Sequence, residues 1–398
     1  MSTMKLIQTC QKHIWFIFIF IGFQTIVAQN QKIDFEEVKN EVNYGRFRYF
    51  EVKGHTGGHL YTGRSLGDLL DSGYGSLELR YGWQPSDPDH WSSQYGFASY
   101  GLGWYSGYMG DPKVFGNPNA LFGFINFPLS HPDKRNVFQV SPAIGLTYNL
   151  IPYDEENNPT NDAIGAKIAV YLNLNLGAEY KLTRELDLLY GFDFTHFSNG
   201  RSFTPNFGLN MYGINVGMRY YNNADQKKIN RDLYTQDLLQ ARFKKPKSRK
   251  NTKLNENVID VYLAIGTVQN EEDRGTSNRY ATFSGVVDYK HKFSNMHAIT
   301  GGFDLFYDES LIIEYPEMKD RFMPAIHAGY DFMFGKFTFR LQGGAYLGDD
   351  KGKDKTFIRA SLQYEISKWM FAQAGLKTKN GSRADWAEFG IGFKPFKW

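Results

Sequence analysis

The sequence predicts an all-β protein, a transmembrane antiparallel β-barrel of the outer-membrane type with about 12 to 16 strands. Three observations predict this fold. The 398 residues are 17% aromatic and include 40 glycines. Apolar and polar residues alternate in period two over most of the chain, which is typical of strands with one apolar face. Apart from one stretch near the N-terminus, long apolar runs are few, because a transmembrane barrel hides its hydrophobicity by alternation.

Residues 1–28 are typical of a cleaved secretory signal peptide. Lys5 and Lys12 precede the apolar run 14–23, which is shorter than the roughly 20 residues that a membrane-spanning helix needs. The single cysteine, Cys10, lies before this run. We therefore expect a mature chain without disulfides, thiolate catalysis or zinc-thiolate sites. The net charge of only +3 argues against nucleic acid as a partner.

About sixteen strand-like segments follow the signal peptide. In the clearest segment, 164–182, apolar residues alternate with polar ones throughout. It is longer than the roughly 5–6 residues usual in soluble sheets and suits a tilted bilayer crossing. The expected segments are 46–54, 74–83, 96–106, 119–127, 136–149, 164–182, 185–198, 206–221, 257–268, 279–293, 296–307, 322–334, 336–347, 355–366, 368–378 and 385–396.

The links between segments alternate in length, which predicts orientation. Those near 183–184 and 294–295 are short, whereas 152–163 and 308–321 are long and polar. Bacterial barrels keep short turns on the periplasmic side and longer loops outside. Odd segments therefore run outward, and the expected location is the bacterial outer membrane. The C-terminal Trp398 after an alternating segment resembles the assembly signal of outer-membrane barrels.

One interruption divides the chain. Residues 29–222 are expected to form the first half of a barrel, 223–256 a basic periplasmic linker, and 257–398 the second half. A solvated linker is favoured over a docking site for a phosphate-rich partner. Because an open half would expose strand edges to lipid, we expect one closed barrel that includes both halves.

Four polar side chains converge at the outward end of the seventh and eighth segments. His196 and Ser198 continue the apolar, lipid-facing row of segment 185–198. The apolar row of the next segment extends to Asn210 and, if strand pairing persists, to Asn206. Polar groups on a lipid-facing wall are costly unless they are functional. The alternative is that they mark the entry of the strands into the headgroup zone.

These residue types suit acyl transfer to water, with an ester of a membrane lipid as the substrate. His196 is the candidate general base and Ser198 the candidate nucleophile. Asn199 or Asn206 is the candidate amide donor to the tetrahedral oxyanion. Asn210 is the candidate third residue, which orients His196 but is weaker than a carboxylate because it carries no charge.

The run His-x-Ser-Asn at 196–199, followed by Pro-Asn-x-Gly-x-Asn at 205–210, resembles the signature of PagL-type lipid A 3-O-deacylases. These are outer-membrane barrels that cleave an acyl ester from lipid A. The resemblance covers roughly 46–222 and includes Asn-x-Ala-Ile-Gly at 161–165. It implies the same roles for the histidine, the serine and the two amides. That family has a glutamate where this chain has Asn210.

The same stretch also resembles outer-membrane phospholipase A, through His-x-Ser-Asn-Gly-Arg-Ser and an asparagine fourteen residues after His196. That enzyme dimerises and uses calcium, whose site would fall near Arg201 and Asn206. The Pro-Asn-x-Gly pattern favours lipid A, for which no cofactor is expected. A non-catalytic porin or structural barrel is the alternative of another class.

His55 and His59 are the other candidate ligands for a metal ion. No cluster of carboxylates accompanies them, so the sequence favours a flexible extracellular loop over a metal site.

Overall fold

The computed structural model describes residues 46–222 and 253–398, except for short gaps at 62, 64, 72, 86–88, 133, 184, 318–320 and 382. The expected signal peptide, Cys10 and all but the last residues of the expected basic linker therefore lie outside the described residues. Within the described part of the chain, no helix is long and apolar enough to cross a membrane.

All sixteen expected strands are present, with antiparallel pairing throughout. The sixth begins at Ala169 and the eighth at Leu209, so residues 164–168 and 206–208, which were expected in strands, lie in loops instead. The first eight are β1 (Arg46–His59), β2 (Tyr74–Pro85), β3 (Ser99–Tyr108), β4 (Gly116–Pro128), β5 (Asn136–Leu150), β6 (Ala169–Lys181), β7 (Leu186–Ser198) and β8 (Leu209–Tyr221). The others are β9 (Lys253–Val268), β10 (Tyr280–Ser294), β11 (His297–Asp308), β12 (Phe322–Phe334), β13 (Phe337–Tyr346), β14 (Thr356–Ser367), β15 (Met370–Lys379) and β16 (Arg383–Lys397). Short helices α3 (Gly67–Leu70), η1 (Trp91–Tyr95), α4 (Pro112–Phe115), η3 (Glu271–Asp273) and α6 (Leu311–Glu314) lie in the links.

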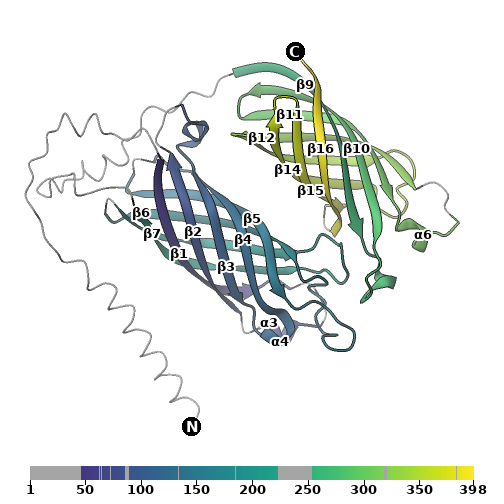
Figure 1. The fold of residues 1–398 in the computed structure, drawn as a ribbon, viewed down its shortest axis with the longest axis horizontal. Coiled ribbons are helices and arrows are strands. Elements are labelled where there is room, and N and C mark those ends of the chain that lie inside the picture. Colours follow the sequence, from purple (N-terminus) through teal and green to yellow (C-terminus); the bar gives the residue numbers. More distant parts are fainter. Residues whose placement is uncertain are drawn as a thin grey trace, which may run out of the picture. The chain divides into compact units, whose positions relative to one another are not determined.

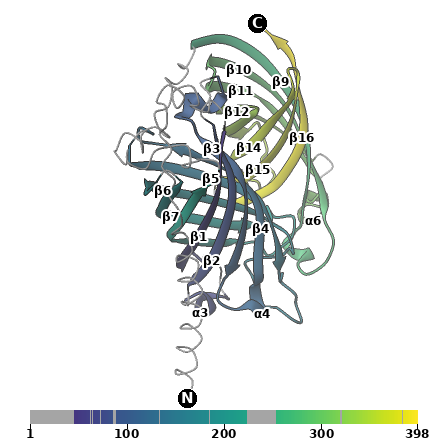
Figure 2. The same ribbon diagram turned by 60° about the vertical axis from the view of Figure 1, so that its left-hand side comes forward.

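The strands form two closed barrels, so the expectation of one barrel is wrong. Strands β1–β8 close through the pairing of β1 with β8, and β9–β16 close through the pairing of β16 with β9. The strands of each barrel curve around its own axis (Figures 1 and 2). In each set of eight strands, every strand edge is therefore hydrogen-bonded to a neighbour. The need to pair these edges was the reason for expecting one closed barrel, and two closed barrels meet it as well.

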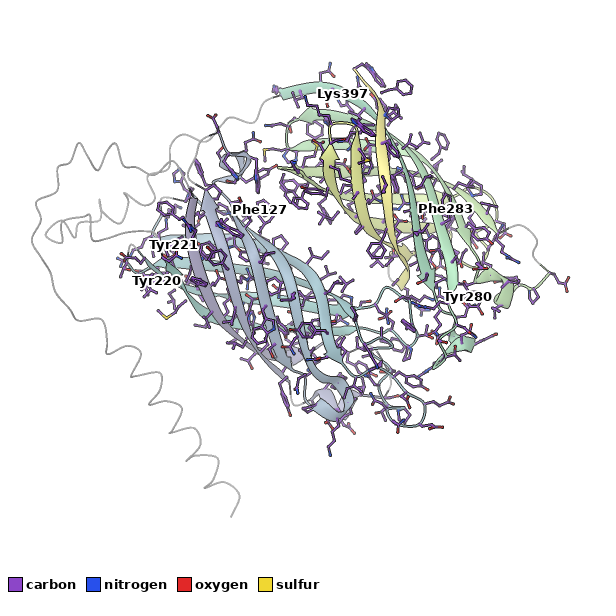
Figure 3. The ribbon with its side chains drawn as sticks, viewed as in Figure 1. Phe127, Tyr220, Tyr221, Tyr280, Phe283 and Lys397 are labelled. Carbon is purple, nitrogen blue, oxygen red and sulfur yellow. The ribbon has the colours of Figure 1, made fainter. Side chains whose placement is uncertain are left out.

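Successive side chains alternate between the outer wall and the lumen. On β8, the neighbours Tyr220 and Tyr221 show this: Tyr220 is 53% exposed and Tyr221 is 1% exposed (Figure 3). The rest of the outer row of β8 is also apolar and exposed, with Tyr212, Ile214, Val216 and Met218. An apolar outer band around a polar interior is the arrangement of a transmembrane barrel.

The lumen of the first barrel is filled by paired charges and aromatic rings. Arg219 lies between Glu51 and Glu179 as ion-pair partners, and Arg80 pairs with Glu78 at 2.6 Å. Buried charges are tolerated when they are paired and hydrogen-bonded. Nearer the outward end, the rings of Tyr105, Tyr171 and Phe197 pack against one another.

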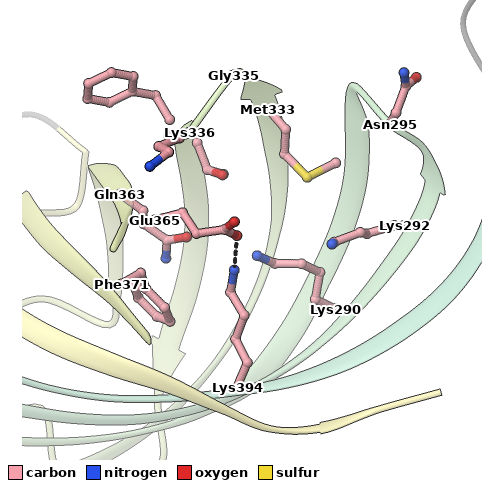
Figure 4. Close-up of a pocket in the computed structure, with 12 residues that line it drawn as sticks. Lys290, Lys292, Asn295, Met333, Gly335, Lys336, Gln363, Glu365, Phe371 and Lys394 are labelled. Carbon is pink, nitrogen blue, oxygen red and sulfur yellow. Dashed lines mark hydrogen bonds and ion pairs between the residues drawn. The ribbon is translucent and has the colours of Figure 1, made fainter. Parts of the chain in front are cut away.

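The second barrel has its own buried network. Arg340 contacts Asp260, Asp288 and Asp331 at 2.7–2.8 Å, and all four side chains are fully buried. At the end with the short turns, a pocket of about 160 Å³ opens (Figure 4). Its lining includes Lys290, Lys292, Asn295, Met333, Lys336, Gln363, Glu365, Phe371 and Lys394, with an ion pair of 2.6 Å between Lys394 and Glu365.

The placement of His55 corrects the expectation of a flexible loop. Strand β1 continues to His59, because its pairing with β2 reaches Gly57 and its pairing with β8 reaches His59. His55 is lumenal and buried, with Nδ1 3.2 Å from a carboxylate oxygen of Asp193. Within the described ranges, no group of three or more His, Cys, Asp or Glu residues is arranged to hold a metal ion.

Candidate active site

His196 lies on the outer wall of the first barrel, as the alternation predicts. Its neighbours in sequence, Thr195 and Phe197, are buried in the lumen, whereas Phe194 on the same row as His196 is exposed. Asp193 also points inward, where it contacts His55 and accepts a hydrogen bond from Asn215. The carboxylate nearest in sequence is therefore on the wrong side of the wall to assist His196.

Asn210 is the direct cross-strand neighbour of His196. The register of β7 and β8 pairs these two residues, and His196 Nδ1 lies 2.7 Å from Asn210 Oδ1. An amide oxygen only accepts, so Nδ1 carries the proton and Nε2 keeps its lone pair. Gly208 lies beside the ring with φ of +76°, and a Cβ there would be 2.8 Å from His196 Cε1. Glycine is needed at this position both for the backbone and for the space.

Ser198 is the last residue of β7, and it is covered by the loop 199–208. It is 9% exposed. Two donors reach its Oγ: the side-chain amide of Asn206 at 3.0 Å and the backbone N–H of Gly200 at 3.3 Å. The Ser198 hydroxyl can itself donate to Asn206 Oδ1 at 3.4 Å. Within the described chain, no hydrogen bond joins the His196 ring to Ser198 Oγ.

The two candidate amides occupy different positions. Asn206 Oδ1 accepts the backbone N–H of Asn199 at 3.1 Å, which turns the Asn206 amide nitrogen toward Ser198. The Asn199 side chain instead donates to Phe203 O at 3.1 Å, across the loop. The sequence interpretation missed the Gly200 N–H. The sequence feature that could have indicated this donor is Gly200, the glycine directly after His-x-Ser-Asn, which has φ of +62°.

A second loop of the first barrel, 151–168, supports the far end of loop 199–208. The backbone N–H groups of Phe207 and Gly208 donate to Asp162 O and Ala163 O at 3.3 and 2.9 Å. Asn161 anchors this supporting loop, because its buried amide donates to Ile151 O at 2.8 Å. Its Oδ1 also accepts the Ile164 N–H at 3.2 Å. This explains why the resemblance extends to 161–165.

The Tyr61 hydroxyl donates a hydrogen bond to the Asp162 carboxylate in the same loop. Burial of the phenol and the neighbouring carboxylate raise the pKa of Tyr61 to about 12. The hydroxyl therefore stays neutral and remains a donor at every physiological pH. This bond secures Asp162, whose carbonyl holds Phe207.

The residues to which the phospholipase resemblance assigns calcium have protein partners. Asn206 bonds to Ser198 and Asn199, and the Arg201 guanidinium lies 3.6 Å from the Asp385 carboxylate.

Comparison with known proteins identifies the family over both barrels. Residues 75–219 match the model of lipid A 3-O-deacylase (PagL), and residues 257–398 match the C-terminal domain of acyloxyacyl hydrolase. No curated protein matches the chain.

Solved structures with some similarity include outer-membrane pore proteins. A mutant of the Rh. blastica porin is 12% identical, covering 87% of this chain and 99% of the porin with a TM-score of 0.19. A mutant of TodX, a monoaromatic hydrocarbon channel, is 10% identical, with coverages of 88% and 90% and a TM-score of 0.18. The Acinetobacter baumannii outer membrane protein Omp33 is 9% identical, with coverages of 88% and 98% and a TM-score of 0.16.

The strand pairing establishes the two barrels, and the two family matches together cover most of the chain. The chain belongs to the lipid A 3-O-deacylase family of outer-membrane enzymes and carries the C-terminal domain of acyloxyacyl hydrolases.

Proposed function

We propose that this lipid A deacylase works by a Ser198/His196 mechanism on the lipid-facing wall of the first barrel. The observation that carries the proposal is the hydrogen bond of 2.7 Å between His196 Nδ1 and Asn210, which leaves Nε2 free to accept a proton. Ser198 lies two residues along the same row, with two hydrogen-bond donors at its Oγ. A base, a nucleophile and donors for an oxyanion are the parts that acyl transfer needs.

In the first step, the Ser198 hydroxyl turns from Asn206 toward His196 and transfers its proton to Nε2. Catalytic hydrogen bonds often form only when substrate is bound. Ser198 Oγ bonds to the ester carbonyl carbon, and the carbonyl oxygen becomes an oxyanion. The Asn206 amide and the Gly200 N–H already point at Oγ, so a small shift lets them donate to that oxyanion.

Collapse of the tetrahedral intermediate breaks the ester bond. The sugar hydroxyl leaves with the proton held by His196, and the acyl chain remains on Ser198. A water molecule then gives a proton to His196 and attacks the acyl-serine. Ser198 Oγ leaves with the proton from His196, and the fatty acid is released. Asn210 keeps the ring oriented throughout and contributes no charge, so it stabilises the imidazolium less than a carboxylate would.

The surroundings of the site suit a lipid substrate. Phe194 precedes His196 on the outer row of β7, and Tyr212 follows Asn210 on that of β8; both are exposed on the wall. In the membrane, such side chains contact acyl chains. The ester of a lipid that diffuses along the wall is therefore the group that can reach Ser198.

Phospholipid hydrolysis is the second candidate, because the partner of His196 is an amide, as in the phospholipase A resemblance. That activity would require calcium. A passive channel is disfavoured, since the lumenal charges, such as Arg219 and Arg340, are buried and paired with one another.

Mass spectrometry of lipid A from cells that express the wild type or Ser198→Ala tests the proposal. We expect the wild type to remove one acyl chain and the variant to leave lipid A intact. The same acylation pattern in both strains would refute the proposed mechanism. Release of fatty acid from phospholipid vesicles by the purified wild type, abolished by a calcium chelator, would establish the phospholipase alternative instead.

A further inference from the structure

The link between β9 and β10 in the second barrel contacts the loop that covers Ser198 in the first. Both barrels lie within one compact unit. The centre of the contact is Gln269, which is fully buried. Its Oε1 accepts the backbone N–H of Thr204 at 2.7 Å and lies 3.2 Å from the Thr204 hydroxyl.

Gln269 holds loop 199–208 at two points. Its backbone N–H donates to Arg201 O at 3.1 Å, three residues before Thr204. Its Nε2 is satisfied within its own link, by Thr276 O at 3.0 Å and Asn278 O at 3.1 Å. All polar groups of the side chain are therefore paired, and its position is fixed.

Other contacts with the second barrel surround the same loop. A Cβ built on Gly200 would lie 2.9 Å from Ala387 Cβ, and the Arg279 guanidinium lies 4.7 Å from the centre of the Phe203 ring. The Thr204 hydroxyl is also 3.3 Å from Asn270 O.

The held positions flank the groups that face Ser198. Gly200 precedes Arg201, and Asn206 lies two residues after Thr204. Both donors at Ser198 Oγ therefore belong to a loop whose middle is fixed by the second barrel and whose end is fixed by Asp162 and Ala163. A displacement of about 1 Å in such hydrogen-bond donors can lower the rate of the reaction roughly 10²-fold.

We propose that Gln269 is a positioning residue for the deacylation reaction, through which the second barrel holds the oxyanion donors of the first in place. The inference rests on the proposed role of Ser198. It gives the C-terminal barrel a part in catalysis without any contact between Gln269 and the substrate.

Three variants of the full-length enzyme test the role. Gln269→Leu removes the acceptor for Thr204 and the donor to Thr276 and Asn278. Gln269→Glu keeps an acceptor for Thr204 and replaces the donor to Thr276 and Asn278 with a second carboxyl oxygen. Gln363→Leu is the matched control, a buried glutamine of the second barrel whose amide bonds to Gln373 at 2.9 Å, away from the loop.

The measurements are lipid A deacylation kinetics and the rate at which a fluorophosphonate probe labels Ser198, with loss of fluoride. Heat-modifiable migration on gels verifies that each barrel is folded. We expect Gln269→Leu to lower kcat and the labelling rate by about 10- to 100-fold, with KM within about twofold of wild type. Gln269→Glu should retain most of the activity that Gln269→Leu loses, and Gln363→Leu should match the wild type.

Wild-type rates in Gln269→Leu would overturn the inference. Equal losses in both Gln269 variants would assign the effect to the folding of the β9–β10 link and would overturn the role of the Thr204 bond. If instead the probe does not label wild-type Ser198 while lipid A is still deacylated, the proposed nucleophile is wrong. The two failures are thus distinguishable.

Discussion

The two barrels have the same architecture and different chemistry on their outer walls. Each has eight antiparallel strands, closes on itself and fills its lumen with ion pairs. The seventh strand of the first barrel, β7, ends in His196 and Ser198. The seventh strand of the second, β15, has Leu376 and Thr378 near its corresponding end.

Their hydroxyl groups are used differently. The Thr378 hydroxyl donates to the backbone carbonyl of Ile358 on the neighbouring strand at 3.0 Å, so it belongs to the sheet. Ser198 Oγ instead receives two donors from a loop that folds back over it. The fold is therefore not what distinguishes the two walls; the difference lies in two side chains and the path of one loop.

The largest expected effect comes from removing the base. His196→Gln should lower kcat by about 10³-fold, because a general base typically contributes 10²- to 10⁴-fold. The measurement is the rate of fatty-acid release from lipid A in detergent micelles. The control is His297→Gln in the second barrel, whose ring contacts Tyr330, and this variant should keep full activity. Comparable losses of kcat in both variants would contradict the proposal that the catalytic base lies on the outer wall of the first barrel alone.

Asn206→Asp should lower kcat by about 10²-fold. The substitution keeps an acceptor for the Asn199 N–H, but it replaces the donor at Ser198 with an anionic oxygen close to the developing oxyanion. Single-turnover kinetics with a lipid A substrate measure the loss. Asn199→Asp is the informative comparison, since its side chain bonds to Phe203 O, and a smaller loss is expected there. A larger loss in Asn199→Asp would transfer the oxyanion role to that residue.

A glycine comparison tests the loop. Gly200 and Gly381 both have positive φ and follow the seventh strand of their barrels. An L-residue in this conformation costs roughly 1–2 kcal/mol, so Gly200→Ala should lower kcat by about tenfold by displacing the loop. Gly381→Ala carries the same backbone cost and should leave kcat unchanged. Both values come from the same steady-state assay, and an unchanged kcat in Gly200→Ala would show that the loop tolerates displacement.

The smallest effects are expected at Asn210. Asn210→Ala should lower kcat severalfold by freeing the His196 ring. Asn210→Asp should raise kcat by roughly fivefold, because a hydrogen bond to a charged acceptor is stronger by about 1 kcal/mol. Steady-state kinetics across a pH series measure both variants. A decrease in Asn210→Asp would show that the site is adapted to a neutral third residue.

Much of this molecule could be predicted from local pattern. Strand positions follow from period-two alternation, and the same parity predicts that His196 faces outward and that Asp193 does not. The pairing of His196 with Asn210 follows from the register across one link. These features depend only on residues close together in the chain.

What could not be predicted depends on contacts between distant residues. Alternation shows that each strand has an apolar face, but it does not show which strand pairs with β8, so one barrel and two were equally compatible with it. Strand β8 pairs with β1, and this closure separates the two halves. The Gly200 N–H and Gln269 act through the backbone path of a loop, which side-chain patterns do not encode.

The ion pairs that fill both lumens bear on the permeability of the membrane. Porins admit solutes because their lumens hold water. Here the interior positions hold Arg219, Arg340 and their carboxylate partners in direct contact. We therefore expect these barrels to admit fewer solutes than porins do.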